Sequence, residues 1–222
     1  MGPSTNQVTY FQPGCTASGR ILILIPIIHT AADLGGLNEP IQRWKVRKLG
    51  KEAWKRNNEL LDAFWKQIEE TIEGLLLPYE RTRVYQDGLP VCGHEREIIA
   101  DMARVGSRNY LLLLKLAEKG AKLMGSESAE LLVEEYQLAH QRFGTQNPQG
   151  SAREQLNAEA LEASLLERRD QFMGHRISST LQNGETGLVF LGMLHAIEPW
   201  LDQNIQVVRP IRQSVRRGGL RR

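Results

Sequence analysis

This sequence has few cysteines and no long apolar segment, and each shortage argues against particular classes of protein. Cys15 and Cys92 are its two cysteines, and neither belongs to a C-x-x-C pair. The pattern therefore argues against a thiolate zinc site and against a disulfide framework. The longest apolar run, Ile21–Ile28, is interrupted by Pro26 and is far shorter than the roughly 20 residues that cross a bilayer. We expect no membrane association and a reducing, cytoplasmic location.

The familiar nucleotide-binding and catalytic motifs are also missing. The sequence contains no G-x-G-x-x-G, G-x-x-x-x-G-K-[ST], G-x-S-x-G or H-E-x-x-H. The net charge is only +2, and the stretch 209–222 holds six of the 28 basic residues and none of the 26 acidic ones. The rest of the chain is therefore acidic on balance, and the basic stretch has no aromatic residue to stack on bases. We do not expect nucleic acid as a partner.

Short apolar segments alternate with helical patterns along most of the chain, which is typical of a parallel sheet covered by helices. Because residues 1–19 are polar and residues 211–222 are rich in arginine and glycine, we expect a flexible arm, a single α/β domain over 20–210 and a basic tail. The predicted strands are Ile21–Thr30, Arg83–Val91 (stopping near Asp87), Ala121–Gly125, Leu188–Leu194 and Ile205–Val208.

Apolar residues at helical spacing predict two long helices among several shorter ones. The predicted fold is thus a mostly parallel sheet of about five strands with helices on both faces. The predicted helical segments are Pro40–Leu77 with a break at Gly50, Glu95–Lys119 with a break at Gly106, Ala129–Phe143 and Ala152–Leu181.

Polar side chains follow four of the predicted strands at the edge where α/β sheets bind ligands. Histidine, aspartate and glutamate in such places bind metals or move protons. The alternative is that they cap the following helices, a role that would suit Asp33 and Ser126. Two of the five histidines close apolar strands, whereas His94, His140 and His175 are expected on helix ends or surfaces. The candidate residues are His29, Asp33, Asp87, Glu127 and His195.

Arg169 and Asp170 lie on the second long helix, at the border of an apolar stripe. An arginine there can bind a carboxylate or phosphate with two parallel hydrogen bonds. The alternative, which spacing alone favours, is an ion pair on the helix surface.

Two segments near the C-terminus resemble the signature of the TraB/PrgY, TIKI, ChaN and EreA-like superfamily. The signature is an arginine-aspartate pair on a helix, followed by a turn and a strand that closes on G-x-x-H; Arg169-Asp170 and Gly192–His195 match it. The first strand, ending in His29, resembles the N-terminal strand of that family. Two departures are Pro26, near where the family has glycine, and Asp87, which would replace a glutamate.

The resemblance implies an α/β core with paired histidines and acids on one edge, in a family of metal-dependent peptidases, esterases with a histidine base, and haem-binding or regulatory proteins. The first hypothesis is a hydrolase acting on a small molecule or a peptide. His29 and His195 would bind a divalent metal, or serve as base and oxyanion partner without one. The second hypothesis is a protein that binds a small ligand or haem without catalysis.

In the hydrolase hypothesis the acidic and basic neighbours of the histidines also have roles. Asp87 or Glu127 would be the third metal ligand or the general base. Arg169 would bind a charged group of the substrate, Asp170 would orient that arginine, and Asp33 would also bind the substrate.

Overall fold

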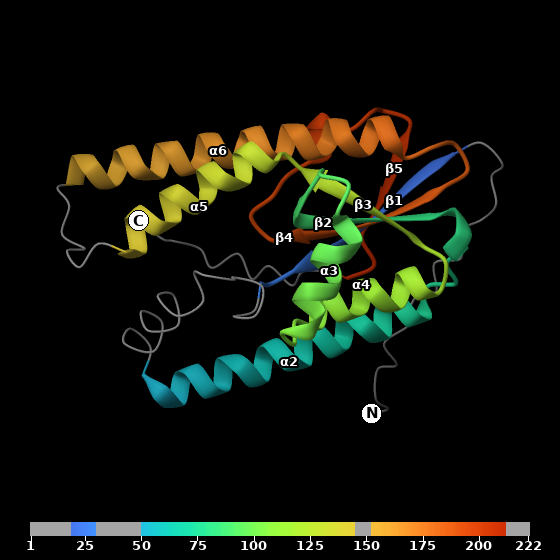
Figure 1. Cartoon of the computed structure of the whole chain (residues 1–222), viewed down its shortest axis with the longest axis horizontal. Helices are drawn as coiled ribbons and strands as arrows, with labels where there is room; N and C mark the ends of the chain where they lie inside the picture. The colour runs from blue at the N-terminus through green and yellow to red at the C-terminus, as the bar shows by residue number, and fades with distance from the viewer. Residues whose placement is uncertain (1–18, 30–49, 145–151, 212–222) are drawn as a thin grey trace, which may run out of the picture.

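A five-stranded parallel sheet forms the centre of the protein, as the sequence predicts (Figure 1). The computed structural model describes residues 19–29, 50–144 and 152–211. The strand order is β3-β2-β4-β1-β5. Because every pair of neighbouring strands is parallel, the carboxyl ends of all five strands lie at one edge of the sheet. The strands are β1 (Arg20–Ile27), β2 (Thr82–Pro90), β3 (Lys122–Glu127), β4 (Thr186–Gly192) and β5 (Ile205–Val208).

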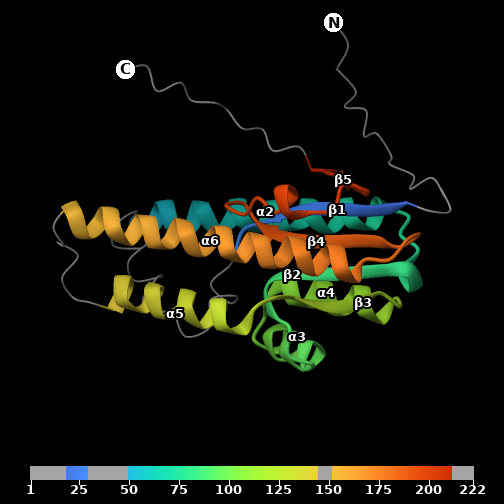
Figure 2. The same cartoon turned by 90° about the horizontal axis from the view of Figure 1, so that it is seen from above.

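Helices cover both faces of this sheet and make three layers, which Figures 1 and 2 show from two sides. Two single turns of 3-10 helix lie in the connections, Tyr79–Arg81 between α2 and β2 and Glu198–Trp200 between β4 and β5. The break between α3 and α4 lies where Gly106 predicts it. The α-helices are α2 (Lys51–Gly74), α3 (Glu95–Arg104), α4 (Arg108–Glu118), α5 (Ala129–Gly144) and α6 (Ala152–Thr180).

The alternating side chains of the strands supply one apolar core on each face. On one face Ile23 and Phe190 pack with α2, α3 and α4, and on the other Leu22 and Val189 pack with α6. α2 presents Trp65, Ile68 and Ile72 to its core, a spacing of three and four residues that places all three side chains on one side of the helix, and Leu75, directly after the helix, joins the same core. Because both faces of the sheet are covered, β1 and β4 carry apolar side chains on both faces.

Strand β2 runs further than its sequence suggests. Gly88 and Pro90 predict an end near Asp87, yet β2 continues to Pro90 across a register shift against β3, between Gln86 and Pro90. Gly88 takes a φ of +81° there, a conformation that costs glycine little. The expected end of the strand is therefore a bulge, which re-aims the side chains beside it.

Strand β3 also extends past its predicted end, and this changes the environment of two polar residues. Ser126 and Glu127 lie inside the strand and are fully buried. The Ser126 hydroxyl donates to the carbonyl oxygen of Gln86 in β2, so Ser126 is not a helix cap. Ser128 has that role, since its Oγ accepts from the backbone N–H of Leu131 in α5 at 3.4 Å.

The ends of the predicted domain have few described residues. Ile211, placed in the tail by the sequence, is 6% exposed and belongs to the core on the face of the sheet that α2, α3 and α4 cover. Residues 212–222 and 1–18 lie outside the described part of the chain. Among the described helices, none is both long enough and apolar enough to cross a membrane.

The contact between α6 and the 3-10 turn Glu198–Trp200 gives a test of the packing. A Cβ added to Gly174 would lie 2.4 Å from Trp200 Cβ and 2.9 Å from its carbonyl carbon, whereas one added to Gly74 in α2 would meet nothing within 4 Å. We expect Gly174→Ala to destabilise the protein by about 1–3 kcal/mol through overpacking. Gly74→Ala should be neutral or stabilising. Chemical denaturation measures both, and equal effects would contradict the packing.

Candidate functional site

The candidate site lies at the carboxyl edge of the sheet, where residues from five elements form one buried charge cluster. The side chains of five of its members are at most 8% exposed. They are Asp87 of β2, Glu127 of β3, Arg169 and Asp170 of α6, and His195 in the loop after β4. His29, two residues beyond the end of β1, has a side chain that is 36% exposed. All the candidate residues named from the sequence converge here except Asp33, which lies outside the described residues.

Asp87 is the centre of the cluster, because four groups surround its carboxylate. Oδ1 accepts from Arg169 Nη2 at 2.8 Å, and Oδ2 accepts from the backbone N–H of Gly192 at 3.0 Å. The Nε2 atoms of His29 and His195 lie 3.1 Å and 3.3 Å from the same Oδ2. Burial opposes ionisation of Asp87, but the hydrogen bonds with His195 and His29 hold its pKa well below the usual range.

The neighbouring arrangement of β1, β4 and β2 explains why both histidines reach one carboxylate. β4 pairs with β1 on one side and with β2 on the other, and Ile27 is opposite Gly192 in that register. The residues that follow β1 and β4 therefore emerge beside the bulge of β2, which carries Asp87. The two histidines thus follow neighbouring strands of the sheet, β1 and β4.

Glu127 and Arg169 form a buried pair with two parallel hydrogen bonds. Arg169 Nη2 and Nε donate to the two oxygens of Glu127 at 2.6 Å and 3.2 Å, and the Gly88 N–H approaches Oε1 at 3.3 Å. Burial raises the pKa of Glu127 even though Arg169 favours its ionised form. Arg169 also contacts Glu135 of α5 through Nη1. The surface ion pair that spacing favours for Arg169 is therefore wrong, because the side chain points into the protein.

His195 is held by a carboxylate at each ring nitrogen. Nδ1 lies 2.6 Å from Asp170 Oδ1, and Nε2 faces Asp87. Asp170 also accepts from the backbone N–H of Ala196 at 2.9 Å, so it orients the loop as well as the ring. Burial disfavours the imidazolium, but the hydrogen bonds with Asp170 and Asp87 raise the pKa of His195 to about 9. His195 is thus a cation at neutral pH.

The acidic and basic groups next to this cluster define which cofactors it suits. Asp87, Glu127 and His195 each place one ligand atom within 4.8 Å of the others, a donor set that matches a divalent metal. However, Arg169 already donates to both carboxylates, and a metal-bound histidine must be neutral. A cation among these atoms would have to displace the guanidinium and a proton, so the arrangement does not fit a metal ion.

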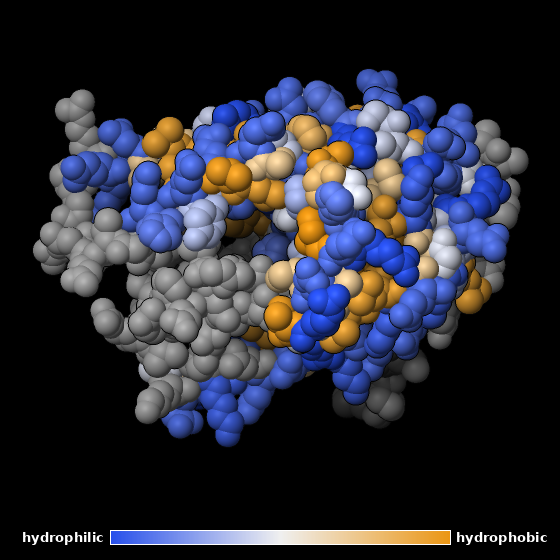
Figure 3. Space-filling view, in the orientation of Figure 1, coloured by the Kyte–Doolittle hydropathy of each residue, from blue (hydrophilic) through white to orange (hydrophobic). Residues whose placement is uncertain are grey.

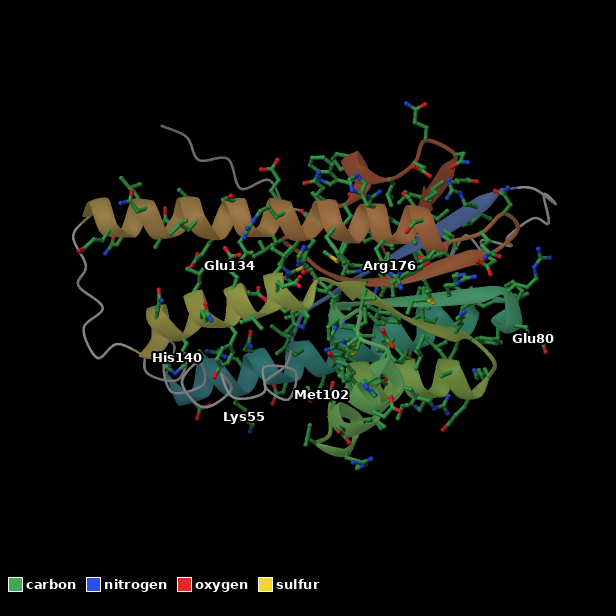
Figure 4. The ribbon with its side chains drawn as sticks, turned by 45° about the horizontal axis from the view of Figure 1, so that its top comes forward. Lys55, Glu80, Met102, Glu134, His140 and Arg176 are labelled. Carbon is green, nitrogen blue, oxygen red and sulfur yellow. The ribbon has the colours of Figure 1, made fainter. Side chains whose placement is uncertain are left out.

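A pocket lies between α5 and α6 and begins at the charge cluster. Its volume is about 380 Å³. Ion pairs of Arg168 with Glu134 and of Arg169 with Glu135 join the two helices, and Figure 4 shows Glu134 on the side of α5 that faces α6. The lining residues are Glu135, Leu138, Ala139, Glu159, Glu162, Ala163, Leu165, Leu166, Arg169 and Leu194.

Other polar residues of the sequence lie away from the site. His140 and His175 are exposed on α5 and α6, and His94 precedes α3 without a capping hydrogen bond from its side chain. Arg176 lies on the sheet side of α6 (Figure 4), where its Nε donates to the Gly125 carbonyl oxygen at 3.2 Å.

The sequence missed several participants of the cluster. Among them are the backbone N–H groups of Gly88 and Gly192, and Glu135. Backbone donors carry no side-chain signal, and the role of Glu135 depends on how α5 packs against α6.

Comparison with known protein families, with characterised proteins and with solved structures finds no match to this chain.

The raised pKa of His195 predicts a loss of stability in alkali. Because the folded state binds this proton more tightly than the unfolded chain does, the stabilisation is complete below pH 6.5, the ordinary pKa, and disappears as the pH rises through about 9. The loss should be at most about 3 kcal/mol, since each tenfold change in proton affinity corresponds to 1.36 kcal/mol. Denaturation between pH 6 and 10 measures it.

The matched control is His195→Gln, which cannot titrate. We expect this variant to be less stable at neutral pH, because Asp87 and Asp170 lose a charged partner, and to lack the alkaline decline that His195 causes. Parallel stability curves for the two proteins would contradict the assignment.

Proposed function

We propose that the protein is a hydrolase of the esterase or peptidase type, in which His29 activates water without a metal ion. The observation that carries the proposal is the pair formed by His29 Nε2 and Asp87 Oδ2 at 3.1 Å, with the histidine 36% exposed and the carboxylate 3% exposed. A buried carboxylate that accepts from one ring nitrogen orients the ring and fixes its tautomer, so Nδ1 is the nitrogen that takes up a proton in this proposal.

The reaction follows from this orientation of His29. His29 takes a proton from water while the water oxygen bonds to the carbonyl carbon of the substrate. The bond from that carbon to the leaving oxygen or nitrogen then breaks, and the imidazolium of His29 returns the proton to the leaving group. Water and substrate thus give an acid and an alcohol or amine, with no other reactant.

The remaining members of the cluster are positioning residues in this proposal. His195 and Arg169 supply the positive charge that keeps buried Asp87 ionised. Asp170 holds His195 in place through the 2.6 Å contact at Nδ1, and Glu127 fixes the guanidinium of Arg169. Asp33 stays a candidate for contact with substrate on sequence grounds alone.

We also infer that the protein works in the cytoplasm. Cys92 is a free and exposed thiol, and such thiols persist where the compartment is reducing.

Replacement of His29 tests the proposed base. We expect His29→Ala to lower kcat/KM on fluorogenic ester and amide substrates by about 10²–10⁴-fold, the usual contribution of a general base. His29→Gln should be equally impaired, because an amide accepts a proton poorly. The matched control is His140→Ala, an exposed histidine on α5, which should hydrolyse at the normal rate. Unchanged turnover in His29→Ala would rule out the base.

Removal of metal ions tests the proposed mechanism separately. Arg169 binds the two carboxylates that a metal ion would need, and His195 is protonated. We therefore expect the hydrolytic rate after dialysis against EDTA to stay within about twofold of the rate before it. Loss of activity that added zinc or manganese restores would show a metal enzyme instead. A Soret band in the purified protein, without turnover of any ester or amide, would support the alternative of a non-catalytic haem or ligand binder.

A further inference from the structure

Gly192, the last residue of β4, lies against the charge cluster with no room for a side chain. A Cβ added to it would lie 2.7 Å from Asp87 Oδ2, 3.4 Å from His195 Cδ2 and 3.5 Å from His29 Nε2. The first of these distances is shorter than Cβ atoms normally make with any neighbouring heavy atom. Glycine allows the backbone to come this close to other groups because it has no Cβ.

The same glycine also holds the oxygen that both histidines approach. Its backbone N–H donates to Asp87 Oδ2 at 3.0 Å. The Nε2 atoms of His29 and His195 lie 3.1 Å and 3.3 Å from that oxygen. Three groups thus meet at one carboxylate oxygen, and they have room to do so because the α-carbon beside them carries only hydrogen.

Neither the backbone conformation nor the packing of the next two residues requires glycine at this position. The φ of Gly192 is not positive, unlike that of Gly88. Met193 and Leu194, which follow it, carry large side chains that are 56% and 82% exposed. Leu194 lines the pocket between α5 and α6, a region where Figure 3 shows hydrophobic residues among hydrophilic ones. The requirement for glycine therefore comes from the charge cluster itself.

We propose that Gly192 is a positioning residue for the general base, because its missing side chain lets His29 reach Asp87 and its N–H keeps the accepting oxygen in place. The inference rests on the proposed hydrolase, in which His29 is that base. An alanine at position 192 would force the new methyl group and Asp87 Oδ2 apart. We expect this movement to lengthen the 3.1 Å contact with His29, and a hydrogen bond weakens as its length grows.

Nitrogen NMR of the His29 ring tests this inference apart from catalysis. With the ring neutral, we expect the proton on Nε2 in the wild-type protein, because the hydrogen bond to Asp87 selects that tautomer. Gly192→Ala should show a mixture of both tautomers. A ring that keeps the wild-type tautomer in this variant would overturn the inference.

The matched control is Gly187→Ala, in the same strand. A Cβ there would lie 2.7 Å from Leu22 Cδ1 and 3.3 Å from Leu181 Cδ2, so it is as crowded as one at Gly192 but meets only apolar side chains. We expect Gly187→Ala to lower the melting temperature through overpacking and to leave the His29 tautomer unchanged. The same tautomer mixture in both variants would show a general effect of crowding in β4 and contradict the assignment.

A second pair of variants tests the same contact through stability, which matters if Gly192→Ala is too unstable for NMR. Asp87→Ala removes the one atom that would lie within 3.0 Å of the added Cβ. We therefore expect Gly192→Ala to lower the melting temperature of the wild-type protein but not that of Asp87→Ala, since residues in contact have coupled effects. An equal loss in both backgrounds would place the crowding elsewhere and contradict the inference.

Turnover of the fluorogenic esters and amides links Gly192 to the base. We expect Gly192→Ala to lower kcat/KM by about tenfold or more, within the range of a general base. Added to His29→Gln, the same change should cost less than about twofold, because the contact that it disturbs is already gone. A structural role unconnected with His29 would lower turnover by the same factor in both backgrounds.

The two measurements separate this inference from the proposed function. If His29→Ala loses turnover but Gly192→Ala keeps the wild-type tautomer and rate, the role of Gly192 is wrong and the hydrolase stands. If the wild-type protein hydrolyses no ester or amide, yet Gly192→Ala alone changes the His29 tautomer, the hydrolase is wrong and the positioning of His29 by Gly192 stands.

Discussion

The rest of the site depends on one constraint, which is that the ionised carboxylate of Asp87, buried at the edge of the sheet, must be surrounded by hydrogen-bond donors. A buried charge without partners costs several kcal/mol, so the fold must bring donors to it. Arg169 comes from α6, the N–H of Gly192 from the end of β4, and the two histidines from the segments after β1 and β4. These contacts tie three strands and a long helix to one side chain, and their joint presence keeps the carboxylate charged.

Part of this arrangement is predictable from the sequence because it depends on short patterns. Apolar runs give the strands, and a parallel sheet sends the residues that follow those runs to one edge. That reasoning places His29, Asp87, Glu127 and His195 near one another, as the structure has them. The order of the strands, with β4 between β1 and β2, brings the residues that follow these three strands close together.

What the sequence cannot supply depends on packing between distant segments. The sequence suggests that β2 ends near Asp87, where the structure has a bulge. Glycine and proline, here Gly88 and Pro90, are typical both of a bulge and of the end of a strand. Arg169 appears as a surface residue, since a charged residue beside an apolar stripe can point either way, and only the partners from β2 and β3 decide that it points inward. Asp170, expected to orient Arg169, contacts His195 instead, because the loop after β4 folds back onto α6.

The balance of charge explains why the two buried carboxylates beside Arg169 differ. Asp87, Asp170 and Glu127 face two buried cations, Arg169 and His195, so one negative charge is in excess when all three acids are ionised. Asp87 has the larger share of donors and its pKa falls, whereas burial raises the pKa of Glu127. The donors around Asp87 therefore favour its ionised form more strongly than Arg169 favours that of Glu127. In the proposed hydrolase, the carboxylate that orients His29 is thus held in its ionised form by its neighbours in the cluster.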